Sequence, residues 1–103
     1  MPQMIPFLAI GNVKSGELAG SASALQLPNI SCRMVMFVAQ NGNAGDVYIG
    51  GAGVTVPDGT TDATSGYELK ASAQTPWIPC SNLNLFYRIC DNAGDDLLYL
   101  AVD

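Results

Sequence analysis

The residues that could do chemistry are three cysteines and a few clustered carboxylates, because the chain contains no histidine. Without histidine, neither a Ser-His-Asp triad nor a Cys-His pair can form. A cysteine nucleophile needs a lowered pKa, and neither a cluster of cations nor a helix N-terminus is predicted beside Cys32, Cys80 or Cys90. We therefore expect three free, mostly buried thiols in a protein that matures in a reducing cytoplasm, with a Cys80–Cys90 bridge as the alternative.

The carboxylates form two groups, one at Asp91, Asp95 and Asp96 and the other at Asp58 and Asp62. Paired carboxylates can hydrolyse glycosides only when they face each other across a groove. The first group could also offer oxygen ligands to Ca²⁺, although its spacing is not that of an EF-hand loop. Both groups fall in predicted turns, where Asp is typical for backbone reasons. The sequence thus predicts no enzyme, no metal site and no cofactor, with Ca²⁺ binding as the open alternative.

Charge and hydropathy exclude two classes of partner. The net charge is −5, and the four basic residues are isolated from one another: Lys14, Arg33, Lys70 and Arg88. Such a chain has no basic stripe for nucleic acid and little attraction to an anionic membrane. No stretch reaches the roughly 18 apolar residues of a membrane span, and the apolar N-terminus lacks the basic region of a signal peptide. We expect a soluble protein that is not exported by a cleaved signal.

The elements that must position these residues are short strands. The chain has 103 residues, which is typical of one domain. Short apolar runs alternate with Gly, Pro, Asn and Asp at intervals of roughly 8–12 residues, the pattern of an all-β sandwich or barrel. We expect a single-domain antiparallel β-sandwich, jelly-roll-like, over residues 1–103, in which residues 1–10 form either a strand or an N-terminal arm. The predicted strands are 5–10, 22–27, 31–40, 46–50, 54–56, 67–72, 82–90 and 97–102. Residues 19–25 could also be interpreted as a short helix, but Gly20 and the serines there argue against it.

One tetrapeptide, Asn-Ala-Gly-Asp, occurs twice in the chain. Asn43-Ala44-Gly45-Asp46 and Asn92-Ala93-Gly94-Asp95 each lie between two apolar runs. Asn and Asp tolerate left-handed backbone, and Gly supplies a positive φ at no steric cost. The two tetrapeptides therefore predict two β-hairpins. The repetition itself reflects either an internal duplication or chance, since these are ordinary turn residues.

The strongest predicted strand, 31–40, is apolar on both faces. One face of a strand in a two-layer antiparallel fold normally meets water, so the second face needs a cover. A loop or a terminal segment could supply the cover, and so could a partner subunit. Charged residues make up only 13% of the chain, against roughly 25% in average domains, which also indicates a covered surface. The candidate interface residues are Met1, Pro2, Met4, Ile5, Phe7, Met34, Met36 and Trp77.

From Asn43 onward the chain resembles small structural proteins of tailed bacteriophages, namely capsid decoration (cement), head-fibre and tail-associated β-domains. The resemblance is carried by Val47-Tyr48-Ile49-Gly50-Gly51 with Val54, then Gly66-Tyr67-Glu68-Leu69, Asn82-Leu83-Asn84-Leu85-Phe86-Tyr87, and Ala93-Gly94-Asp95 with Leu98-Tyr99-Leu100-Ala101. It implies a non-enzymatic virion protein that is made in the host cytoplasm, sits on the capsid surface and stabilises the head. Its implied partners are the major capsid protein and other copies of itself in a homo-oligomer.

Two other functions remain open at this point. A tail- or fibre-associated module could bind host-surface glycan or another virion protein, using Trp77, Tyr67 and the Asp58–Gly66 loop as an aromatic platform with acidic rims. Trp77 itself lies between two prolines, which is typical either of a core plug under a loop or of a binding surface. A structural or assembly module unrelated to viruses is the third candidate.

Overall fold

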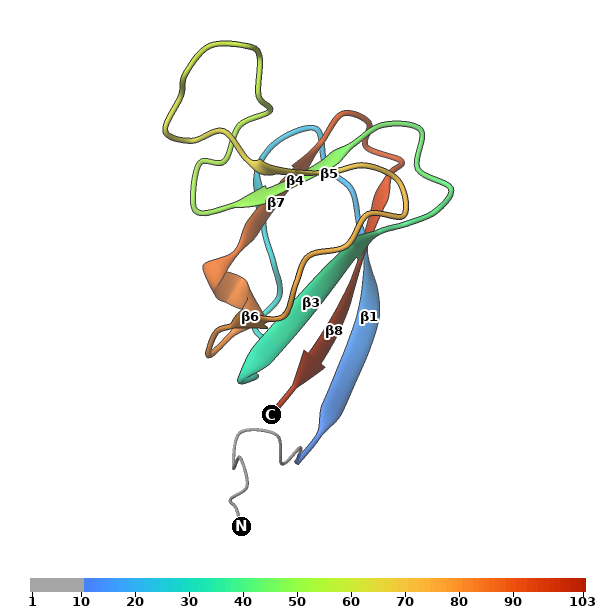
Figure 1. Ribbon diagram of the computed structural model, residues 1–103, viewed down its shortest axis with the longest axis vertical. Helices are drawn as coiled ribbons and strands as arrows, with labels where there is room; N and C mark the ends of the chain where they lie inside the picture. The colour runs from blue at the N-terminus through green and yellow to red at the C-terminus, as the bar shows by residue number, and fades with distance from the viewer. Residues whose placement is uncertain (1–10) are drawn as a thin grey trace.

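The structure is a computed structural model that describes residues 11–103. The predicted strand 5–10, the proposed arm and the candidate residues Met1, Pro2, Met4, Ile5 and Phe7 lie outside the described residues. Eight strands form two four-stranded antiparallel sheets (Figure 1). Sheet A has the order β1 (Val13–Ala19), β8 (Asp96–Val102), β3 (Met34–Ala39), β6 (Ile78–Pro79), and sheet B has the order β2 (Leu25–Gln26), β7 (Tyr87–Cys90), β4 (Val47–Gly50), β5 (Tyr67–Leu69).

The strand order is that of a jelly roll. Along the chain, every connection between strands except β4 to β5 crosses from one sheet to the other. The strands pair as in one long hairpin that has been rolled up: β1 with β8, β2 with β7, β3 with β6 and β4 with β5. The tip of this rolled hairpin is the loop of residues 51–66, which projects from the molecule in Figure 1. The predicted antiparallel β-sandwich is therefore confirmed.

The two predicted hairpins are wrong. β3 and β4, which flank the first Asn-Ala-Gly-Asp, lie in different sheets, and so do β7 and β8, which flank the second. Both tetrapeptides form corners at which the chain passes from one sheet to the other. In the rolled hairpin, the strands that flank these corners pair as β3 with β8 and β4 with β7. Neither Gly45 nor Gly94 has a positive φ, which glycine adopts only at Gly53 and Gly59 among the described residues.

The two corners pack against each other through polar contacts. Asp95 is 3% exposed, and its carboxylate accepts hydrogen bonds from the backbone N–H groups of Ala44 (2.9 Å) and Gly45 (3.0 Å). The Asn43 side chain bonds both the N–H and the carbonyl of Asp96, at 2.8 and 2.9 Å. Asp91 accepts from the N–H of Asp46 at 2.9 Å. Because buried backbone donors need partners, these acidic residues stabilise the corners.

The core lies between the sheets and follows the period-two alternation of the strands. In β3 the odd positions Val35, Phe37 and Ala39 are fully buried, whereas the even positions face outward. From sheet B, Val47 and Leu69 are buried against them, and Leu83 closes one end of the core. The two apolar faces that the sequence shows in 31–40 are thus a core face and an outer face.

Other predicted elements differ from the structure. β1 was not predicted, whereas the absence of a helix at residues 19–25 agrees with the Gly and Ser content of that segment. The predicted strand 54–56 is reduced to a single bridge between Thr55 and Ser65. The predicted strand 82–90 begins instead with a turn of 3₁₀ helix, η2 (Leu83–Leu85), which Asn82 caps by accepting from the N–H of Asn84. Polar capping by Asn competes with strand pairing, so β7 starts only at Tyr87.

Candidate functional site: the outer face of sheet A

The outward side of sheet A carries an apolar surface that extends across its two central strands. Strand pairing brings Met34 opposite Val102, Met36 opposite Leu100 and Val38 opposite Leu98. All of these side chains are partly exposed. We call the six residues the outer face; they are Met34, Met36, Val38, Leu98, Leu100 and Val102. Large exposed apolar patches are typical of surfaces that bind another molecule, so the outer face is the candidate site.

The margins of the outer face are more polar than its centre. On β1, Val13 pairs with Val102 and is 64% exposed, and Glu17 pairs with Leu98. Asp96 lies next to Glu17 at this end and raises the pKa of the Glu17 carboxyl, first by a side-chain hydrogen bond and then by charge repulsion. The outer face therefore has an acidic margin, and a cation on a partner would relieve its repulsion.

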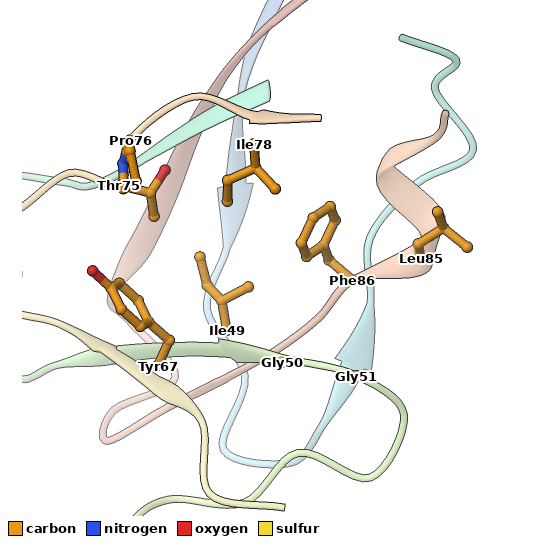
Figure 2. A pocket seen from close by; sticks show the side chains of 9 residues that line it. All are labelled: Ile49, Gly50, Gly51, Tyr67, Thr75, Pro76, Ile78, Leu85 and Phe86. Carbon is orange, nitrogen blue, oxygen red and sulfur yellow. The ribbon is translucent and has the colours of Figure 1, made fainter. Parts of the chain in front are cut away.

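A second apolar feature, the edge groove, opens between the sheets where β5 and β6 form their edges (Figure 2). The groove has a volume of about 340 Å³. Figure 2 shows Ile49 and Tyr67 rising from sheet B toward Thr75 and Ile78 on the other side, with Phe86 at one end. Tyr67 and Leu85 are each 59% exposed at the rim. The lining is mostly apolar, as in pockets for small ligands or for inserted side chains.

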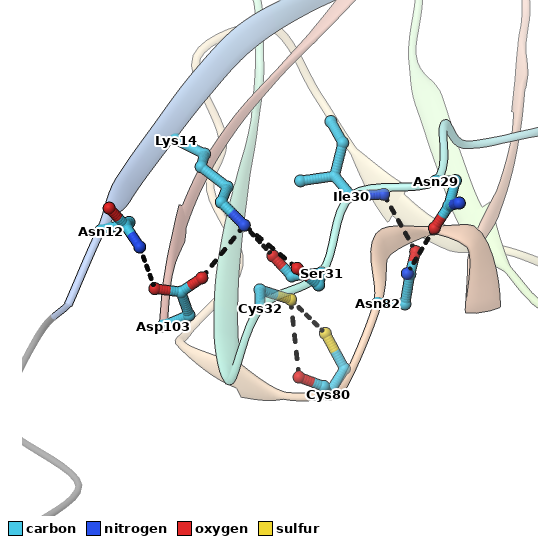
Figure 3. Close-up of polar contacts among 9 residues, drawn as sticks. All are labelled: Asn12, Lys14, Asn29, Ile30, Ser31, Cys32, Cys80, Asn82 and Asp103. Carbon is cyan, nitrogen blue, oxygen red and sulfur yellow. Dashed lines mark hydrogen bonds and ion pairs between the residues drawn. The ribbon is translucent and has the colours of Figure 1, made fainter.

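A third feature is a hollow of about 650 Å³ at the end of the outer face, lined by Cys32, Arg33, Met34, Pro79, Cys80, Ser81 and Val102. The region beside it is held by polar contacts (Figure 3). Lys14 donates to the Ser31 carbonyl and forms an ion pair with Asp103 at 3.0 Å. Lys14 and Asn12 together lower the pKa of the Asp103 carboxyl. The Sγ atoms of Cys32 and Cys80 lie 3.4 Å apart.

The structure brings two of the predicted interface residues together and separates a third. Met34 and Met36 lie side by side on the outer face, as predicted for a strand with two apolar faces. Trp77 precedes β6 and is 42% exposed, so its interpretation as a core plug is wrong. Trp77 is also not among the residues that line the edge groove with Tyr67, so the two do not share that site. The contribution of β8 was missed, although Leu97–Val102 is apolar at successive positions.

The remaining candidate residues have structural contacts. Asp91 and Asp95 bond backbone N–H groups at the corners, and Asp58 accepts from both the N–H and the hydroxyl of Thr60 within its own loop. Within residues 11–103, no three Cys, Asp or Glu side chains are grouped so that they could hold a metal ion. Cys80 lies beside Cys32, and the backbone N–H of Cys90 bonds Ser21. The described part of the chain also contains no helix with the length and apolar character needed to cross a membrane.

Comparison with known proteins adds no relative to this description. No protein-family model matches the chain, and neither curated sequences nor solved structures give a significant match.

Proposed function

We propose that the protein is a non-enzymatic virion structural protein, a capsid decoration protein that binds the outside of a phage head and stabilises it. The observation that carries the proposal is the outer face, an apolar surface on the two central strands of sheet A. The resemblance of residues 43–103 to phage structural proteins supports the same function. Jelly rolls occur in both viral capsid and lectin domains, so the fold is compatible with this function but does not select it.

In this proposal the outer face docks on the major capsid protein. Burial of apolar surface contributes roughly 25 cal/mol per Å², and stable interfaces bury roughly 1,600 Å² in total. Because the chain carries a net charge of −5 and the outer face has an acidic margin at Glu17 and Asp96, we expect basic groups on the capsid around an apolar centre. A protein that binds only the assembled shell stabilises that shell by mass action. Repeated copies on a symmetric head also favour contacts between copies.

The first experiment is immunogold electron microscopy of phage particles prepared from the organism that encodes this chain, with an antibody raised against the chain. Label spread evenly over the heads would support a decoration protein. Label confined to the tail or to one vertex would favour the second function described below. If no particle carries label, both virion functions are contradicted.

A residue-level test compares two substitutions on different sheets. Met36→Lys places a charge at the centre of the outer face, and Leu25→Lys places the same charge on β2 of sheet B, where Leu25 is 46% exposed. We expect Met36→Lys to weaken binding to purified heads by at least about tenfold, the loss typical of an interface centre, while Leu25→Lys binds as the unchanged protein does. Thermal unfolding of each variant controls for folding. Equal binding by both variants would exclude the outer face as the docking surface.

The edge groove favours a second candidate function, a tail- or fibre-associated module that binds host-surface glycan. Tyr67 offers an exposed ring at a groove of about 340 Å³, and aromatic rings beside polar groups are typical of glycan sites. Tyr67→Ala should abolish binding to a glycan array, whereas Trp77→Ala should preserve it, because Trp77 does not line the groove. Binding that is lost only with Trp77→Ala would place a glycan site outside the groove and contradict this assignment.

A further inference from the structure

Two cysteines that are distant in sequence meet directly beyond the β3–β6 pair, with Cys32 before β3 and Cys80 after edge strand β6. The Sγ atoms of Cys32 and Cys80 lie 3.4 Å apart, and both thiols are free (Figure 3). Their backbones are held by β-type hydrogen bonds, from Cys32 N–H to the Ser81 carbonyl (3.1 Å) and from Cys80 N–H to the Arg33 carbonyl (3.0 Å). The two thiols therefore lie close together across backbone that already has its native pairing, and a bond between them must shorten the Sγ–Sγ distance from 3.4 Å to the roughly 2.05 Å of a disulfide.

We propose that Cys32 and Cys80 are a reversible redox pair, which closes to a disulfide in an oxidising thiol–disulfide pool and fastens edge strand β6 to β3. The co-reactant is a small disulfide such as oxidised glutathione. The Cys80 thiolate attacks one sulfur of glutathione disulfide, forms a mixed disulfide and releases one reduced glutathione. The Cys32 thiolate then attacks Cys80 Sγ and releases the second. One glutathione disulfide is reduced to two thiols while two protein thiols are oxidised to one disulfide.

The exposure of the two thiols sets this order. Cys80 is partly exposed and Cys32 is 6% exposed, so Cys80 meets the reagent first and Cys32 resolves the mixed disulfide. Both residues line the hollow of about 650 Å³, which gives a small disulfide room to approach. Burial and the neighbouring Cys80 raise the pKa of the Cys32 thiol to about 12. The thiolate is the nucleophile, so we expect the resolving step to be slow at neutral pH and to accelerate as the pH rises.

Cys90 serves as the internal control. It is 2% exposed on β7 of sheet B, and an added Cβ at Gly20 would lie 3.0 Å from its sulfur. Burial raises the pKa of its thiol as well, and Cys90 is a free cysteine in the sheet opposite the one that contains β3 and β6. It should remain a thiol when the other two close.

The closed bridge would affect both apolar hollows, because β6 contributes to each. Ile78 lines the edge groove, and Pro79 and Cys80 line the hollow at the end of the outer face. β6 has only two residues and no strand beyond it among the described residues, so it has few hydrogen bonds to keep it in place. A disulfide between Cys80, directly after β6, and Cys32, shortly before β3, would fix the shared rim of both sites and slow local opening at this edge.

The test equilibrates the full chain with mixtures of reduced and oxidised glutathione, then alkylates it and measures intact mass and unreduced peptide maps. We expect the number of alkylatable thiols in the unfolded, quenched protein to fall from three to one, with a linked peptide that contains Cys32 and Cys80. Cys90→Ser should still close the bridge, and Cys80→Ser should prevent it. A stable mixed disulfide at Cys80, or a link that includes Cys90, would overturn the proposal.

A second measurement addresses the consequence of closure. Hydrogen exchange of the Cys32 and Cys80 amides, whose bonds to Ser81 and Arg33 lie directly beyond the β3–β6 pair, should be slower in the oxidised protein than in the reduced protein. The amide of Cys90 on β7 of sheet B, which bonds the Ser21 carbonyl in the β1–β2 connection, should exchange at the same rate in both. If each of the three amides exchanges at the same rate in the oxidised and the reduced protein, the disulfide does not fasten the edge strand.

Discussion

Phe37 and Phe86 meet edge to face inside the sandwich, with ring centroids 5.2 Å apart and ring planes at 74°. Phe37 precedes Asn43 by as many residues as Phe86 precedes Asn92. The two copies of Asn-Ala-Gly-Asp therefore follow aromatic residues at matching positions, one on sheet A and one entering sheet B. The chain passes from sheet A to sheet B at the first corner and from sheet B to sheet A at the second. The two matching residues therefore come from opposite sheets and meet in the core between them.

This contact belongs to an approximate two-fold relation between the halves. Exchanging β3 with β7 and β4 with β8 turns the β3–β8 pair into the β7–β4 pair, and both pairs exist. The relation is not exact, since Ala39 pairs with Leu97 whereas its counterpart Arg88 pairs with Ile49 and not with Tyr48. A jelly roll has such a relation whatever its sequence, so the internal duplication stays a hypothesis.

The aromatic contact predicts energetic coupling between the two rings. Phe37→Leu should lower the free energy of unfolding by about 1–2 kcal/mol, since Phe37 is fully buried. In a double-mutant cycle with Phe86→Leu, we expect a coupling of about 0.5–1.5 kcal/mol, the usual value for an edge-to-face pair. Urea unfolding of the four proteins measures it. A cycle of Phe37→Leu with Val13→Ala, a 64% exposed residue, should be additive. Equal coupling in both cycles would contradict the prediction.

The equivalent glycines of the two copies should respond differently to alanine. A Cβ at Gly45 would lie 2.7 Å from the Cβ of Asp91, whereas a Cβ at Gly94 would meet nothing within 4 Å. We expect Gly45→Ala to lower the free energy of unfolding by about 1–3 kcal/mol through overpacking. Gly94→Ala should be neutral or slightly stabilising, because alanine restricts the unfolded chain. Thermal unfolding compares them, and a loss of the same size in both variants would show that backbone conformation, not close packing, requires the glycines.

Asp95 should be the most sensitive of the turn carboxylates. Asp95→Asn replaces one acceptor oxygen by an NH₂ group that faces backbone donors at Ala44 or Gly45. Leaving a buried donor unsatisfied costs about 1–3 kcal/mol of unfolding free energy. The matched control is Asp62→Asn, because Asp62 is exposed and, within residues 11–103, its side chain accepts from the Thr60 hydroxyl alone. Chemical unfolding should separate the two variants, and equal stabilities would mean that water replaces the lost bonds at the corner.

The acidic margin of the outer face predicts a pH-dependent gain in stability. The pKa of Glu17 is raised by Asp96, so the folded protein holds this proton more tightly than the unfolded chain and ionisation opposes folding. Glu17→Gln should therefore raise Tm slightly at pH 7. The gain should vanish below the ordinary pKa of 4.5, where glutamate is neutral in both states. Glu68→Gln should not raise Tm at pH 7, because Glu68 lies 3.5 Å from Lys70. A Tm gain that persists at low pH would exclude the electrostatic cause.

The sequence predicts the strands of this fold better than their pairing. The strand at 31–40 could be predicted because it is an almost continuous apolar run, but β1 could not, because Ser15 and Gly16 resemble a turn. An edge strand with one exposed face tolerates such residues. The corners were misassigned because Asn, Gly and Asp are equally suited to reversing a strand within a sheet and to passing between sheets. The choice depends on contacts between distant segments.

The candidate site was predictable in part for the same reason. The two apolar faces of 31–40 indicate Met34 and Met36 as candidates for a covered surface. Leu98 and Leu100 join them only because β8 pairs with β3, and no local pattern in residues 97–102 specifies that neighbour. The Cys32–Cys80 contact likewise depends on the β3–β6 pairing, which joins segments far apart in the chain.

The rolled arrangement of the strands also constrains how the chain reaches its fold. β1 pairs with β8, so the first and last described strands must find each other, and of the pairs formed only β4 with β5 joins consecutive strands. Long loops must close before most sheet hydrogen bonds can form, so we expect folding in milliseconds to seconds, as for other folds of high contact order. Each sheet draws strands from both halves of the chain. A half-synthesised or cleaved chain therefore contains no complete sheet, and the fold becomes available only when the last strand has left the ribosome.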